Sequence, residues 1–194
     1  NRLAGLPPET GQLSQLQVLN LHQNRFSRFP ETINQLASLT HLHLDDNFIA
    51  RLPSRIGQLI HLQQLWLGGN RLNQLPAEIG QLTSLIQLHL ERNLLRQIPV
   101  SIGELKQLAI LNLNDNQLSQ LPNVVSRLPQ LTVLNLDNNP ALDPPTEFGK
   151  LLDYRQQKEQ TEQAYQNLFR SIQDPMLMVS RSNGRVESIN PQGL

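Results

Sequence analysis

The sequence predicts an α/β solenoid, in which stacked coils share a curved parallel sheet on one side and short helical segments on the other. The first observation is that asparagine returns every 23 residues, at Asn24, Asn47, Asn70, Asn93, Asn116 and Asn139. The second is that a proline stands six residues after Asn1 and six residues after each of these asparagines up to Asn116. A strict period of this length indicates stacked repeats.

Each repeat is expected to contain one short strand. Around Leu65, apolar and polar residues alternate, which is the period of a strand buried on one face. The same alternation recurs around Leu19, Leu42, Leu65, Leu88, Leu111 and Leu134. Six parallel strands are therefore expected side by side, about 4.8 Å apart.

The chain must reverse after each strand, and the recurring asparagine is expected to satisfy the backbone there. Its side chain carries two donors and one carbonyl, which can bond the backbone of its own and the adjacent coil. The Leu-Pro pair then starts a short helical or extended return segment. Gly57, Gly80 and Gly103 are expected where this segment bends back. Asn34 fills the same place because Asn tolerates left-handed backbone, and Ser126 fills it less well.

The whole unit from Leu62 to Leu82 reads Leu-x-x-Leu-x-Leu-x-x-Asn-x-Leu-x-x-Leu-Pro-x-x-Ile-Gly-x-Leu. This pattern resembles the leucine-rich repeat family, and the resemblance runs from Asn1 to about Asn139. It is similar to the short Leu-Pro repeats of bacterial, Roco and Scribble-like proteins. The resemblance implies a protein-binding solenoid that uses its concave sheet face.

Three segments are predicted: residues 1–145 as the solenoid, 146–173 as a capping or linker helix, and 174–194 as a hairpin. The chain begins in the middle of a repeat, so we expect an excerpt of a longer protein. After Asn139 the pattern decays, and residues 140–152 are interpreted as a cap over the apolar end. The wholly polar stretch 155–163 favours a spacer helix, and heptad spacing leaves open a dimer through this helix.

The last segment carries two apolar runs on either side of Asn183-Gly184. Asn-Gly between apolar runs is a strong hairpin signal. Together with the helix before it, this stretch resembles the opening of a PAS sensor domain. The resemblance implies that the chain contains the truncated start of such a domain.

Composition narrows the class of partner. Lys and Arg together number 16, as do Asp and Glu, so no net charge attracts nucleic acid or an anionic membrane. Aromatic residues make up 4%, too few for the interleaved aromatics of a nucleic-acid surface. No apolar run approaches the roughly 20 residues of a membrane span. Because the chain has no cysteine, we expect it in the cytoplasm.

The outward positions of the predicted strands form the candidate partner site. These positions hold His41, His43, Asp45, Gln64, Trp66, Gln87, His89, Glu91 and Asn112. Trp66 should lie between His43 and His89, with Gly68 and Gly69 leaving room beside the indole. An exposed Trp is a typical interface anchor, worth about 2 kcal/mol or more at a hot spot. The alternative is that these side chains merely tolerate the surface of a parallel sheet.

Catalytic and metal sites are weighed and set aside. His41, His43 and Asp45 suggest zinc, but alternate strand residues lie about 6.6 Å apart and a third ligand would have to come from Gln64 or a neighbouring coil. We predict no metal and no cofactor. The chain has no Cys nucleophile, Walker loop or G-x-G-x-x-G motif, so we predict that this segment is not an enzyme.

We call the asparagines that return every 23 residues, Asn24 to Asn139, the ladder asparagines. Arginines follow them on one mildly basic rim, at Arg25, Arg28, Arg51, Arg71 and Arg96. Acidic residues lie nearby in sequence, so we interpret this rim as a solvated, charge-mixed edge.

The leading hypothesis is a protein-recognition segment of a larger cytosolic signalling protein. By resemblance, the parent would carry an output domain such as a nucleotide cyclase, a histidine kinase or a diguanylate cyclase. The alternative is a stand-alone leucine-rich-repeat scaffold or adaptor, whose tail is only a capping helix and a hairpin.

Overall fold

The computed structural model describes residues 1–142, 177–179 and 186–189. The chain divides into two compact units, Asn1–Phe148 and Gly149–Leu194, and each is described by itself. Within the described ranges, no helix has the length and apolar character needed to cross a bilayer.

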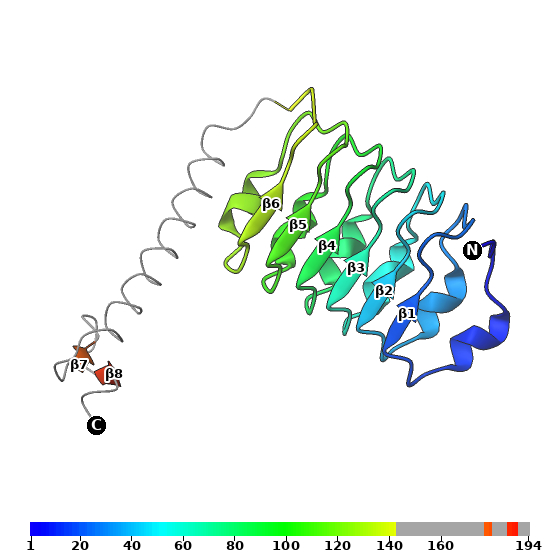
Figure 1. Ribbon diagram of the computed structural model, residues 1–194, viewed down its shortest axis with the longest axis horizontal. Coiled ribbons are helices and arrows are strands. Elements are labelled where there is room, and N and C mark those ends of the chain that lie inside the picture. Colours follow the sequence, from blue (N-terminus) through cyan, green and yellow to red (C-terminus); the bar gives the residue numbers. More distant parts are fainter. Residues whose placement is uncertain (143–176, 180–185, 190–194) are drawn as a thin grey trace. The chain divides into compact units, whose positions relative to one another are not determined.

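The first unit contains a six-stranded parallel sheet with the strands in sequence order (Figure 1). The strands are β1 (Val18–Asn20), β2 (His41–His43), β3 (Gln64–Trp66), β4 (Gln87–His89), β5 (Ile110–Asn112) and β6 (Val133–Asn135). Each strand is shifted by one full repeat from its neighbour, so Leu42 pairs with Leu19 on one side and Leu65 on the other. The predicted strand centres and parallel pairing are confirmed.

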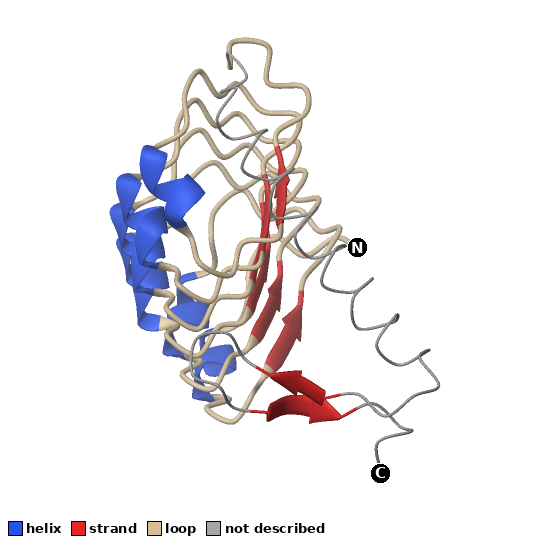
Figure 2. Cartoon of the chain, turned by 90° about the vertical axis from the view of Figure 1, so that its left-hand side faces the viewer, coloured by secondary structure: helices blue, strands red, loops and turns tan. Residues whose placement is uncertain are grey.

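Six 3₁₀-helices form the second layer, on one side of the sheet (Figure 2). They are η1 (Pro8–Gln12), η2 (Glu31–Gln35), η3 (Ser54–Gln58), η4 (Ala77–Gln81), η5 (Val100–Glu104) and η6 (Asn123–Arg127). A proline precedes each helix, and its fixed φ leads the chain from the extended segment into the turn. The predicted solenoid fold class is therefore confirmed.

The core lies between the two layers. Leu65 in β3 and Ile79 in η4 are fully buried, as are their counterparts in the neighbouring coils. Burial fades at the ends, where Leu6 and Leu134 are only partly buried against the core. Leu142 also packs there, and the rest of the predicted cap over 140–152 lies outside the described residues.

The ladder asparagines join neighbouring coils. The Nδ2 group of Asn70 donates to the carbonyls of Leu44 (2.9 Å), Leu67 (3.0 Å) and Gly68 (3.3 Å). Its Oδ1 accepts the backbone N–H of Ile49 at 2.9 Å. One buried side chain thus satisfies backbone groups in its own coil and in the preceding one.

The left-handed backbone positions differ from the expected ones. Positive φ occurs at the residue before each ladder asparagine, namely Gln23, Asp46, Gly69, Arg92, Asp115 and Asn138. The prediction that the return segment bends back in left-handed backbone at Gly57, Gly80, Gly103 and Asn34 was wrong, because these residues lie inside the 3₁₀-helices and none has positive φ.

Those three glycines are needed for close packing between coils instead. A Cβ at Gly57 would lie 2.9 Å from the carbonyl oxygen of Glu78, and one at Gly103 would lie 2.8 Å from Val124 Cβ. Asn34 is half-buried, and its Nδ2 donates to Glu31 Oε2 at 3.0 Å.

The second unit contains an antiparallel pair, β7 (Leu177–Val179) and β8 (Val186–Ile189). Leu177 lies opposite Ile189, and the register shifts between Met178 and Val179. Both strands lie within the segment 174–194 that was predicted as a hairpin. The turn at Asn183-Gly184 and the predicted helix over 146–173 lie outside the described residues.

Candidate functional site

The register of the sheet aligns outward side chains into columns that run across the strands. We call this surface the sheet face: the first and third residue of each strand from β1 to β6, and the residue two positions beyond each strand. The nine predicted partner-binding residues all lie on it and are all half-buried. They are His41, His43, Asp45, Gln64, Trp66, Gln87, His89, Glu91 and Asn112.

Three rings stack at the centre of the sheet face. His43, Trp66 and His89 occupy the same position in β2, β3 and β4. The His43 and Trp66 ring centroids lie 5.2 Å apart at 20°, and those of Trp66 and His89 lie 3.8 Å apart at 9°. Trp66 was expected to be exposed, but it is half-buried between two imidazoles. Its indole Nε1–H is buried without a hydrogen-bond partner among the described residues.

Burial keeps this stack uncharged near neutral pH. It lowers the pKa of His43 and of His89 below the ordinary value of 6.5, although Asp45 and Glu91 each act to raise the pKa of their neighbour. His43 Nδ1 lies 3.9 Å from Asp45 Oδ1, and His89 Nδ1 lies 3.9 Å from Glu91 Oε2. At these distances the carboxylates only partly offset the loss of solvation.

The net charge of the sheet face is negative. Its third column contains Asp45, Glu91 and Asp137, and no Lys or Arg occupies any of its three columns. The stacked histidines are neutral near pH 7, and the contact that an imidazole of this column makes with a carboxylate of the column is that of His22 with Asp45.

The expected space beside the indole is not open. The carboxylate of Glu91 lies over Gly68, and a Cβ at Gly68 would come within 2.7 Å of Glu91 Cδ. Gly68 is buried, and Gly69 serves the turn with φ +63°. The prediction that these glycines leave room was therefore wrong, because a side chain from the next coil fills the space.

The structure brings together a different set of metal-ligating residues from the one that the sequence suggested. His22, Asp45 and Asp46 each offer a ligand atom, and these atoms lie within 4.8 Å of one another. Instead of joining this group, His41 places Nδ1 at 2.8 Å from Thr40 Oγ1. The set His41, His43 and Asp45 does not form a chelating group among the described residues.

Arg92 is a member of this cluster that sequence reasoning missed. Its Nη2 donates to Asp46 Oδ1 at 3.0 Å, across two coils of the solenoid. The contact joins residues 46 positions apart, which equals two repeats of 23. The period could have revealed this pair, because both residues directly precede a ladder asparagine.

The sequence profile described as Leucine rich repeat matches residues 1–49, 60–118 and 88–140. The chain therefore belongs to the leucine-rich repeat family. A comparison with curated proteins found no match.

Solved structures agree with the family. An LRR protein of Leptospira interrogans is 41% identical with a TM-score of 0.69, over 71% of this chain and 35% of that one. The ectodomain of the Arabidopsis thaliana receptor kinase GASSHO1/SCHENGEN3, in complex with CASPARIAN STRIP INTEGRITY FACTOR 2, is 36% identical with a TM-score of 0.64, over 69% and 17%. The leucine-rich repeat domain of the type III effector XopL is 30% identical with a TM-score of 0.66, over 73% and 52%. This chain thus spans about a third of the Leptospira protein and about half of the XopL domain.

Proposed function

We propose that this chain recognises a protein partner through the sheet face, as a segment of a larger cytosolic signalling protein. The observation that carries the proposal is the half-buried ring stack of His43, Trp66 and His89, surrounded by polar side chains on one continuous face. Protein interfaces combine an aromatic centre with polar groups that exchange hydrogen bonds across the contact.

Unsatisfied polar atoms indicate what the partner would supply. Buried atoms without hydrogen-bond partners in the described part of the chain include Trp66 Nε1, Glu91 Oε2 and Asn112 Oδ1. The first needs an acceptor, the second needs a donor, and a buried polar atom left unpaired costs about 1–3 kcal/mol. The acceptor atoms Glu91 Oε2 and Asn112 Oδ1, together with the carboxylates of the third column, favour a partner segment that carries Lys or Arg, whereas the indole N–H of Trp66 requires an acceptor such as a backbone carbonyl.

One relative supports a protein ligand. The Arabidopsis ectodomain of the same family was solved in complex with CASPARIAN STRIP INTEGRITY FACTOR 2. That comparison supports recognition as the role of this chain by analogy of fold, and it does not identify the partner.

The cytosolic signalling parent is supported by more limited observations. The chain contains no cysteine, in keeping with a reducing compartment. The pair β7–β8 follows the solenoid and is compatible with the start of a PAS sensor domain. An output domain such as a nucleotide cyclase or a histidine kinase is proposed by resemblance alone, and the dimer through residues 146–173 stays a prediction.

The test is capture of a partner from lysate, followed by titration with the purified partner. Wild type is compared with the double variant Trp66→Ala/His43→Ala and with Val100→Ala. Val100 is exposed on η5, in the layer opposite the sheet, so it serves as a matched truncation. Circular dichroism first establishes that all three are folded.

We expect wild type and Val100→Ala to bind equally, and the double variant to lose about 2 kcal/mol or more, as at a hot spot. Equal binding by all three proteins would remove the support for the sheet face.

A further inference from the structure

A second charged surface lies beside the sheet face. We call it the arginine flank: the four residues that follow Asn1 and each ladder asparagine from Asn24 to Asn116, on the segments that lead into the 3₁₀-helices. Its residues include no Asp, Glu or Lys. Six arginines belong to it, and all are exposed: Arg2, Arg25, Arg28, Arg51, Arg71 and Arg96.

The positive charge of this flank is not compensated within the described part of the chain. None of the six arginines makes an ion pair there, and Arg71 instead places its guanidinium 4.8 Å over the Phe48 ring. The single Arg–carboxylate pair among described residues is formed by Arg92, which precedes its ladder asparagine and so lies outside the flank. Acids such as Asp45 and Glu91 lie on the other side of the ladder asparagines, whereas Glu31 lies beside Arg28 and Arg51, so the rim is charge-mixed at that place and basic elsewhere.

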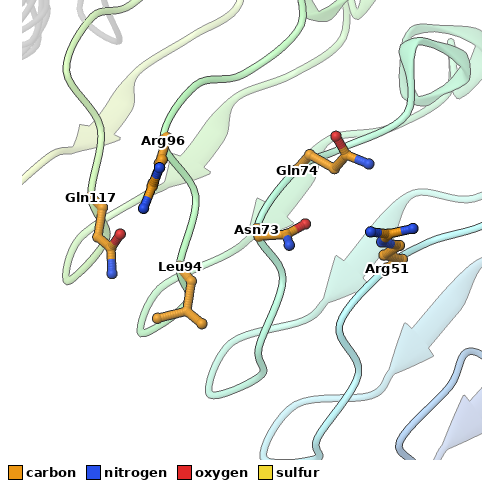
Figure 3. Close-up of a pocket in the computed structure, with 6 residues that line it drawn as sticks. All are labelled: Arg51, Asn73, Gln74, Leu94, Arg96 and Gln117. Atoms are coloured by element: carbon orange, nitrogen blue, oxygen red, sulfur yellow. The ribbon is translucent and has the colours of Figure 1, made fainter.

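A recess of about 520 Å³ lies on the flank (Figure 3). Its lining comes from four successive strand-to-helix connections and contains no acidic residue. The lining residues are Arg51, Asn73, Gln74, Leu94, Arg96 and Gln117. A neighbouring recess between Arg28 and Arg51 includes Glu31, so the first recess is the better site for an anion.

We propose that this recess binds an extended acidic segment of a protein partner, at a site separate from the sheet face. Arg51 and Arg96 offer guanidinium groups, whose planar donors match carboxylates in pairs. Asn73, Gln74 and Gln117 carry both donors and acceptors, which suits the alternating N–H and C=O groups of an extended backbone. Leu94 is 44% exposed and offers an apolar contact.

The same lining disfavours nucleic acid. A phosphodiester backbone presents acceptors only, so the carbonyls of the three amide side chains would lack partners. Single-stranded nucleic acid also needs aromatic platforms for its bases. On the described flank, the partly exposed aromatic ring is that of Phe48, and the guanidinium of Arg71 already lies over one face of it.

The spacing of the arginines sets the expected pattern of the ligand. Arg51 and Arg96 lie two coils apart, which is about 10 Å when neighbouring strands lie about 4.8 Å apart. A peptide in the extended polyproline II conformation advances about 3.1 Å per residue with three residues per turn, so carboxylates three residues apart lie on one face, about 9 Å from each other. The site therefore favours acidic residues at every third position.

The probe is a fluorescent peptide of about 12 residues with Glu at every third position and Ser or Gly between. Fluorescence anisotropy at low salt measures its binding to the whole chain. We expect Arg51→Gln/Arg96→Gln to weaken binding at least about tenfold, because both charged contacts are lost. The matched control Arg55→Gln/Arg127→Gln removes the same number of positive charges, but from η3 and η6. Its affinity for the peptide should stay within about twofold of wild type.

Three results would overturn the proposal. The first is no binding by wild type, and the second is an equal loss in both double variants, which would indicate only general charge attraction. The third is tighter binding of oligo-dT or of phosphatidylserine vesicles that depends on the same two arginines. Trp66→Ala should leave peptide binding unchanged, so this test and that of the sheet face can fail independently.

Discussion

Replacing Asn70 with Ala should destabilise the solenoid by about 2–4 kcal/mol, and the hydrogen bonds show where this cost arises. The backbone N–H of Ile49 is buried and bonded to Asn70 Oδ1. It would be left without a partner, at about 1–3 kcal/mol. The three carbonyls that Asn70 serves lose one donor but keep another, so together they add about 1 kcal/mol. Gly68 O keeps the N–H of Asp46 at 2.8 Å. Leu44 O keeps Asn47 Nδ2, and Leu67 O keeps Asn93 Nδ2, each at 2.9 Å.

The matched control is Asn24→Ala, at the first rung of the ladder. Its Oδ1 accepts the N–H of Leu3, which is only partly buried and can bond to water instead. Its Nδ2 has no bond to a preceding coil among those of the described residues, whereas Asn70 Nδ2 bonds Leu44 O. We therefore expect this change to cost about 1 kcal/mol or less, as for a hydrogen bond exchanged with water.

Urea unfolding followed by circular dichroism and by Trp66 fluorescence measures both changes, and linear extrapolation gives the free energies of unfolding. If the two probes do not coincide, the midpoints are compared instead, because repeat arrays can depart from two-state behaviour. Equal losses for the two variants, or a loss below about 1 kcal/mol for Asn70→Ala, would refute the account of the ladder as an interior hydrogen-bond system.

Two further predictions follow from packing and from protonation. Gly80→Ala should lower stability by about 1–3 kcal/mol in the same urea experiment, because the new Cβ would collide with the backbone carbonyl of Ser101. Gly5→Ala, with nothing within 4 Å of its Cβ, is the control and should be nearly neutral. Burial lowers the pKa of His43 and His89 in the folded state. The unfolded state therefore binds more protons than the folded state as the pH falls below 6.5, and the free energy of unfolding decreases there. His43→Gln/His89→Gln should therefore lose less thermal stability than wild type between about pH 7.5 and about pH 5.5, and an equal loss would contradict this.

The fold could be predicted because every structural requirement is repeated. One strand with alternating residues would be weak evidence, but the same alternation around Leu19, Leu42 and four more leucines fixes both the element and its register. The register in turn places His43, Trp66 and His89 side by side. The sequence alone was therefore sufficient to predict which residues lie side by side on the sheet face, because that depends only on the repeat period.

The errors concern how closely a residue packs against the neighbouring coils. Gly57 was assigned to a bend from its residue type, but it serves the close approach of the next coil. Trp66 was expected to be exposed, but the flat faces of two histidines cover it. Both depend on distances between coils, which the period does not give.

The solenoid converts a preference at one repeat position into a stripe along the molecule, and this explains how a chain with zero net charge can present two charged surfaces. Acidic residues such as Asp45 and Glu91 stand two positions before the ladder asparagine, and arginines such as Arg51 and Arg96 stand three or four positions after it. The ladder asparagine lies between these positions in every coil, so the two signs are separated along the whole array. Equal numbers of charges thus exclude a net field but not local binding. In a repeat protein, charge is therefore informative when it is counted by repeat position. Here that count places carboxylates, which bind cationic groups, on one side of the ladder asparagines and guanidinium groups, which bind carboxylates, on the other.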